Sequence, residues 1–94
     1  MTPNLSTGSD CASVQGFVLR HLGGRAYRSP VPVAVRVPVM RSRTTRHSTR
    51  TLATLALASR AVSSYLGEIG DREAAARWGE MADDLGLVLN GRSR

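Results

Sequence analysis

The chain has 94 residues, among them 13 Arg and no Lys, and it carries seven acidic residues and a formal net charge of +6. This length predicts one small domain. The lone cysteine, Cys11, excludes an internal disulfide and is typical of a reducing compartment. Since no run of about 18 apolar residues occurs, we expect no transmembrane segment. These features favour a cytoplasmic protein.

Residues 1–30 form the first region, which we interpret as a disordered basic leader. Residues 1–16 are rich in Ser, Thr and Gly and lack periodicity. A short helical turn is expected over residues 17–22. Residues 1–28 also resemble a mitochondrial presequence, because they combine Ser, Thr and Arg with a single acidic residue. That resemblance implies import into an organelle as an alternative location.

Residues 31–50 form the second region, in which a Val-rich stretch precedes an Arg-rich one. Valine occupies every odd position from 31 to 39. Alternation of this kind predicts a strand with its valines on one face. Pro32 and Pro38 remove donors from one side, which restricts the strand to a sheet edge. An extended linker is the alternative, because Val-Pro-Val sequences also favour it.

Residues 51–90 form the third region, which we expect to be a hairpin of two amphipathic helices. Apolar residues recur at three- and four-residue intervals in both halves. Gly67 and Gly70 are expected to end the first helix, and Asp71 is expected to cap the second. The fold class is therefore mainly α, with a disordered N-terminal arm, a single Val-rich edge strand or linker, and a C-terminal two-helix hairpin.

The order strand, helix, helix, with Arg36 on the strand, resembles the ribbon-helix-helix family of DNA-binding dimers. The resemblance implies that Arg36 would read bases and that Arg41 and Arg43 would lie near phosphates. The chain departs from this family in its long helices, in Pro38 within the ribbon, and in the acidic start of its second helix.

Charge is strongly segregated along the chain. Residues 11–67 hold nine arginines and no acidic residue, and six acidic residues follow between 68 and 84. A segment of one sign attracts anionic polymers, and the Arg fork fits phosphate bidentately. We therefore expect a small non-enzymatic protein whose Arg-rich arm engages nucleic acid or a ribonucleoprotein. In the alternative, the Arg excess reflects composition bias and the hairpin is a protein–protein interaction module.

The candidate sites follow from these two hypotheses. Neither histidine has a partner at metal-ligand spacing, and no nucleophile motif is present, so we expect no catalytic residue, metal or cofactor. The expected nucleic-acid contacts are Arg36, Arg41, Arg43, Arg46 and Arg50. The expected interface, with another copy of the chain or another protein, is Leu52, Leu55, Val62, Leu66, Trp78, Met81 and Leu85.

Overall fold

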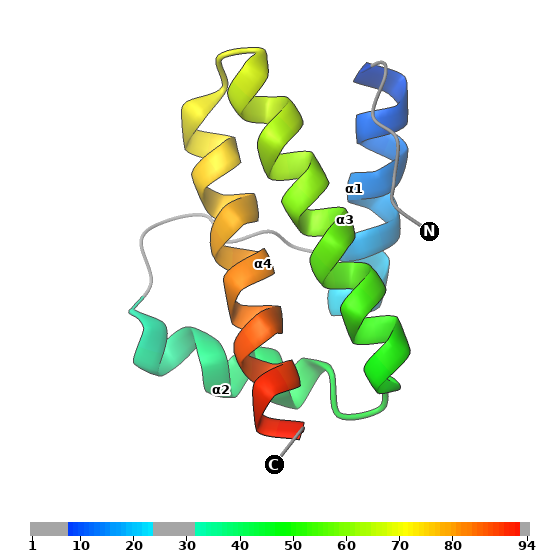
Figure 1. The fold of residues 1–94 in the computed structure, drawn as a ribbon, viewed down its shortest axis with the longest axis vertical. Helices are drawn as coiled ribbons and strands as arrows, with labels where there is room; N and C mark the ends of the chain where they lie inside the picture. Colours follow the sequence, from blue (N-terminus) through cyan, green and yellow to red (C-terminus); the bar gives the residue numbers. More distant parts are fainter. Residues whose placement is uncertain (1–7, 24–31, 93–94) are drawn as a thin grey trace.

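The computed structural model describes residues 8–23 and 32–92 of the chain. Three helices stand side by side, and the remaining one lies across their lower end (Figure 1). The predicted mainly α-helical class is confirmed, and no residue in the described ranges belongs to a strand. The helices are α1 (Gly8–Leu22), α2 (Val33–Arg43), α3 (Thr49–Glu68) and α4 (Arg72–Arg92).

Helices α3 and α4 run in opposite directions and pack against each other (Figure 1). Ser48 caps α3, since its hydroxyl accepts a hydrogen bond from the Thr51 amide at 3.1 Å. A short turn follows α3, in which Gly70 adopts a φ of +91°, a left-handed conformation that suits glycine. The Asp71 carboxylate then accepts a hydrogen bond from the Ala74 amide at 3.2 Å and caps α4. Local caps therefore set both ends of the turn.

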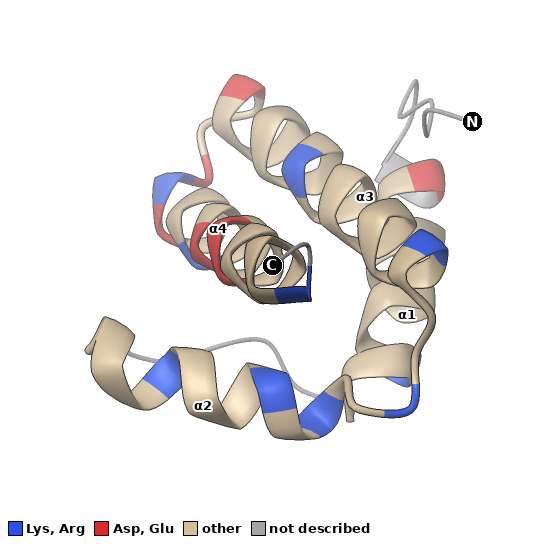
Figure 2. Cartoon of the chain, turned by 60° about the horizontal axis from the view of Figure 1, so that its bottom comes forward, with Lys and Arg blue, Asp and Glu red and all other residues tan. Residues whose placement is uncertain are grey.

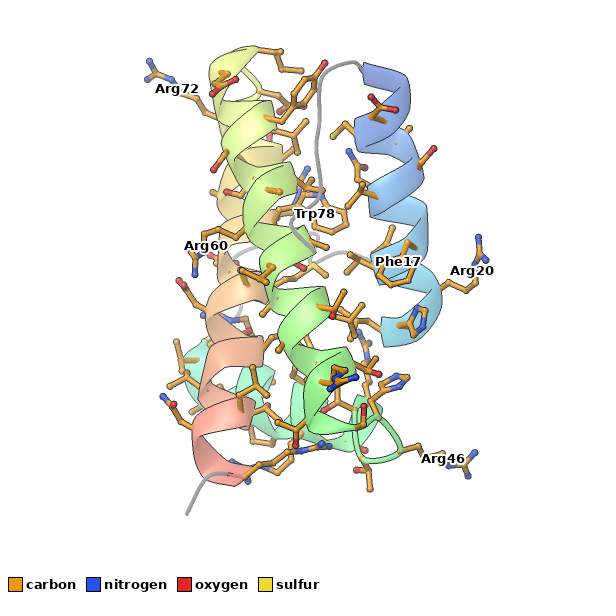
Figure 3. All side chains as sticks on the ribbon, turned by 45° about the vertical axis from the view of Figure 1, so that its right-hand side comes forward. Phe17, Arg20, Arg46, Arg60, Arg72 and Trp78 are labelled. Atoms are coloured by element: carbon orange, nitrogen blue, oxygen red, sulfur yellow. The ribbon has the colours of Figure 1, made fainter. Side chains whose placement is uncertain are left out.

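The core lies between the helices, and all four contribute to it. Trp78 is the largest side chain in it and lies in the interior of the bundle (Figure 3). Ser59 is also buried, and its hydroxyl has no hydrogen-bond partner within the part of the chain that the structure describes. The buried apolar residues are Cys11, Val18, Leu22, Met40, Leu52, Leu55, Ala58, Val62, Leu66, Trp78, Met81, Ala82, Leu85 and Val88.

The predicted edge strand is wrong for the described part of residues 31–39, and so is the linker. Residues 33–43 form helix α2. Val33, Val35 and Val39 are exposed rather than gathered on one buried face. The strand that the ribbon-helix-helix resemblance requires is absent from residues 33–43 for the same reason. Val31 lies outside the described residues.

The side chains that α2 buries explain why it is a helix. Arg36, Met40 and Thr44 are spaced four residues apart, so a helix brings them to one face. Met40 and Thr44 are buried, and Arg36 forms an ion pair with α4. The strand preference of valine depends largely on packing against neighbouring strands. No described segment offers such a neighbour, and the contacts of the helical face prevail.

Pro38 lies within α2 and removes one donor from the helix. The carbonyl that it leaves without this donor belongs to Ala34. Both residues are exposed, so water can hydrate this carbonyl. Pro32 precedes the helix with an extended backbone, and its carbonyl accepts hydrogen bonds from Val35 and Arg36. The prolines that suggested a sheet edge are therefore accommodated at the start and on the outer side of a helix.

The predicted disordered leader is wrong for residues 8–22, which form α1 and pack against α3. Its helical turn, expected over residues 17–22, is the end of a longer helix. Cys11, Val18 and Leu22 are buried, so α1 adds a third apolar stripe to the core. Residues 1–7 and 24–31 lie outside the described residues, and the leader and targeting hypotheses stay untested there. Along residues 8–23 and 32–92, no helix combines the length and apolar character that crossing a membrane requires.

Candidate anion-binding surface

Four arginines gather at the lower end of the molecule, and we call this surface the basic end. Arg41 and Arg43 lie in the last turn of α2, Arg46 lies in the loop that follows, and Arg50 lies in the first turn of α3. Figure 2, which brings the bottom of Figure 1 forward, shows α2 and the loop that joins it to the start of α3. All four residues are exposed, and none forms an ion pair with another described residue. Their guanidinium groups are therefore available to an external anion.

Arg36 is not part of the basic end, although we expected it among the nucleic-acid contacts. Its Nε lies 3.0 Å from Oδ2 of Asp84, and its Nη1 lies 3.6 Å from Oε2 of Glu80. The Arg36 side chain is 10% exposed and that of Asp84 is fully buried. This guanidinium is already neutralised inside the protein. It joins α2 to α4 and is not available to read a base or bind a phosphate.

The remaining paired arginines lie on α3 and α4, away from the basic end. Arg60 binds Asp83 across the two helices at 2.7 Å, and Arg77 binds Glu73 within α4 at 2.8 Å. The acidic residues lie on α4, beside the α3–α4 turn and at the start of α1 (Figure 2). Folding therefore keeps the acidic side chains of the described residues away from the four arginines of the basic end.

Arg92, which was not among the residues predicted from the sequence, holds the loop of the basic end. Its Nη1 donates to the His47 carbonyl at 2.6 Å, and its Nη2 donates to the Thr44 carbonyl at 2.8 Å. Thr44 also donates its hydroxyl to the Met40 carbonyl at 2.8 Å, at the end of α2. The loop that carries Arg46 is thus tied to α4. The sequence gives only a weak signal for this role of Arg92, since Arg in the last turn of a helix is common.

Two histidines tie the same loop to α1. The Nε2–H of His47 donates to the His21 carbonyl at 2.9 Å, and the Nδ1–H of His21 donates to the Phe17 carbonyl at 2.9 Å. The two imidazole rings lie 5.5 Å apart. These bonds give both histidines a structural role. No cluster of His, Cys, Asp and Glu suited to a metal occurs in the described ranges.

The seven residues expected at a protein interface are all buried within the chain itself. They form the contact between the helices, so the surface that faces solvent consists of other residues. An apolar groove lies between α2 and α4, with a volume of about 520 Å³. No local sequence pattern indicates this groove, because two helices that are far apart in the sequence form it. The residues that line it are Val33, Ala34, Val37, Pro38, Arg41, Leu87, Asn90 and Gly91.

Comparison of the chain with protein-family models, with curated proteins and with solved structures found no match.

Proposed function

We propose that this chain is a small non-enzymatic protein that binds the phosphate backbone of nucleic acid through its basic end. The observation that carries the proposal is the contrast between two sets of arginines. Arg36, Arg60 and Arg77 each form an ion pair with a carboxylate. The arginines of the basic end are exposed and have no such partner among the described residues.

These four guanidinium groups have no carboxylate partner among the described residues, and this supports polyanion binding. A phosphate that meets an unpaired guanidinium does not have to displace a carboxylate first. Each contact also releases counterions from the nucleic acid, which favours binding at low salt. Arg43 belongs to α2 and Arg50 to α3, so three consecutive segments share the surface. Ties from α1 and α4 hold the central loop, which reduces the entropy lost on binding.

Phosphate contacts position a protein on nucleic acid but carry no base information. Arg36, the residue that the ribbon-helix-helix resemblance assigned to base reading, is engaged with Asp84. The proposal is therefore limited to binding that is independent of sequence. We expect unrelated duplexes of equal length to bind with similar affinity.

The salt dependence of duplex binding tests the proposal. Four phosphate contacts predict a slope of log K against log salt of about −3.6, at about −0.9 per contact. Replacing Arg41, Arg43 and Arg46 together by Ala leaves Arg50 and should reduce the slope to about −0.9. Fluorescence anisotropy with two unrelated duplexes at several salt concentrations measures both values.

A second triple variant provides the matched control. Arg60→Ala, Arg72→Ala and Arg77→Ala remove the same number of charges from α3 and α4, away from the basic end. The surface ion pairs of Arg60 and Arg77 contribute little to stability, so the fold should persist. We expect this variant to keep most of the wild-type slope. Equal loss in the two triple variants would mean that net charge alone drives the interaction and would contradict the proposed surface.

The second candidate function is a protein–protein interaction module, and the apolar groove between α2 and α4 favours it. Val33 and Leu87 line the groove and are exposed. Apolar residues exposed together on a small protein often mark a contact with another protein. Leu87→Ser should weaken such a contact and leave the salt dependence of duplex binding unchanged. This separates the two functions.

A further inference from the structure

The groove between α2 and α4 combines an apolar floor with a positive border. Val37, Pro38 and Leu87 contribute apolar surface, and Arg41 lies at the rim. A second depression, which Arg41 and Arg92 both line, continues from it along α4. Among the described residues, none that lines either depression is acidic. The groove therefore suits a protruding apolar side chain that has carboxylates beside it.

The turn between α3 and α4 has this chemistry. Ile69 is 60% exposed, the highest exposure among the large apolar side chains of the described residues. Glu68 and Asp71 flank it and are exposed as well. Glu73 is paired with Arg77 in the next turn of α4. The turn thus presents one apolar side chain between two carboxylates.

The turn and the groove lie at opposite ends of the molecule. The α3–α4 turn is at the top of Figure 1, and α2 crosses the bottom. One molecule cannot bring its own turn into its own groove without unfolding. A neighbouring copy can do so, and its groove then remains open for another turn.

We infer that copies of this chain associate head to tail, with Ile69 of one copy in the α2–α4 groove of the next. Ile69 then contacts the apolar floor, and Glu68 and Asp71 approach Arg41 at the rim. A contact between two different surfaces is heterologous and extends into open chains unless the rotation closes a ring. Since the turn is narrow, the buried area is small, and the association is weak and sensitive to salt.

A charge change at Arg72 provides a second, independent test of the association. This residue begins α4 beside Asp71 and is exposed, and its positive charge opposes the attraction to Arg41. Arg72→Glu should therefore strengthen the association. Glu68→Arg should weaken it. Position 68 is the last residue of α3, where a positive side chain also suits the helix end, so this variant should fold.

Sedimentation velocity of the full chain at low salt measures the association, with circular dichroism to check the fold of each variant. We expect the weight-average sedimentation coefficient to rise with protein concentration up to about 1 mM, in the range of weak contacts. Glu68→Arg and Ile69→Ser should each weaken association about tenfold, and Arg72→Glu should strengthen it by a similar factor. Concentration-independent sedimentation of the wild type would overturn the inference.

A charge exchange between the two surfaces identifies the contact. Arg41→Glu alone should weaken the association, because it places a carboxylate opposite Glu68. Arg41→Glu combined with Glu68→Arg should restore it, since the two charges attract again in exchanged positions. A double variant that associates no better than either single variant would show that turn and groove do not meet.

The inference is independent of nucleic-acid binding, and two variants keep the tests apart. Arg46→Ala with Arg50→Ala removes contacts of the basic end that do not line the groove. We expect this pair to weaken duplex binding and to leave the sedimentation unchanged. Ile69→Ser should weaken the association and leave duplex binding unchanged. Association that disappears with Arg46 and Arg50 but survives Ile69→Ser would overturn the head-to-tail contact.

Discussion

The α3–α4 pair and helix α2 are held in the fold by different forces. The pair buries a long apolar stripe from each helix, including Leu55, Val62 and Trp78. Helix α2 buries a single large apolar side chain, Met40, and leaves Val35 and Val39 exposed. It is attached instead through the Arg36 ion pair with Asp84 and through a hydrogen bond from Arg92 to the Thr44 carbonyl at its end.

Because the forces differ, different kinds of substitution should destabilise the two regions. A loss of side-chain volume weakens the α3–α4 pair, because cavities in a packed core are costly. A loss of charge or of a donor weakens the attachment of α2, because a buried ion that loses its partner is not solvated. Three predictions separate these effects, from the largest expected effect to the smallest.

Trp78→Ala should lower the free energy of unfolding by about 3–5 kcal/mol, because Trp78 is 4% exposed and its removal leaves a large cavity. The loss should affect the whole domain, since the core of all four helices is continuous. Urea unfolding followed by circular dichroism measures it. Phe17→Ala is the matched aromatic control. Phe17 is 39% exposed and should cost about 1 kcal/mol or less. Similar losses in both variants would contradict the packing described for α4.

Asp84→Ala should lower the free energy of unfolding by about 3 kcal/mol, because it leaves Arg36 largely buried without its closest carboxylate. The effect should concentrate in α2. Hydrogen exchange should show a larger loss of amide protection in residues 33–43 than in residues 49–68.

Two further variants sharpen the Asp84 prediction. Arg36→Met combined with Asp84→Leu should recover most of the lost stability, since a buried ion pair replaced by apolar groups is often neutral. Asp83→Ala is the control, because the neighbouring Arg60–Asp83 pair is 58% and 63% exposed and should contribute about 0.5 kcal/mol or less. An Asp84→Ala effect as small as that of Asp83→Ala would contradict the role assigned to the buried pair.

Arg92→Ala should lower the free energy of unfolding by about 1 kcal/mol, because it removes charge-assisted hydrogen bonds to the carbonyls of Thr44 and His47. Amide exchange in residues 44–48 should increase while α3 and α4 stay protected. Arg92→Lys should not restore both bonds, since Lys lacks the planar fork. Unchanged exchange in the loop would show that the histidine contacts to α1 suffice to hold it.

Much of the α3–α4 region follows from local sequence. Leu52 and Leu55 lie three residues apart in α3, and Trp78 and Met81 lie three residues apart in α4. All four are buried, as helical spacing requires. Ser48, Gly70 and Asp71 lie at helix ends because of their own conformational and hydrogen-bonding preferences. These signals act within a few residues, so they can be recognised without knowledge of the rest of the fold.

Local sequence predicted only part of the candidate site. The exposed arginines of the basic end were all expected, since they lie in one Arg-rich segment. Arg36 was assigned to the same surface because the sequence does not reveal that a carboxylate 48 residues later is its partner. Arg92 was missed for the corresponding reason, because its acceptors lie 45 and 48 residues earlier in the chain.

The sequence by itself determined that the chain is mainly helical, since helical periodicity and local caps are short-range properties. Only the tertiary structure decided the conformation of residues 33–43. Their alternating valines satisfy a strand pattern, and their Arg36, Met40 and Thr44 satisfy a helix pattern. Contacts with α4 favour the helix over the strand, because a helix brings Arg36 to Asp84 and buries Met40. A local pattern that fits two structures is decided by the long-range contacts that one of them can make.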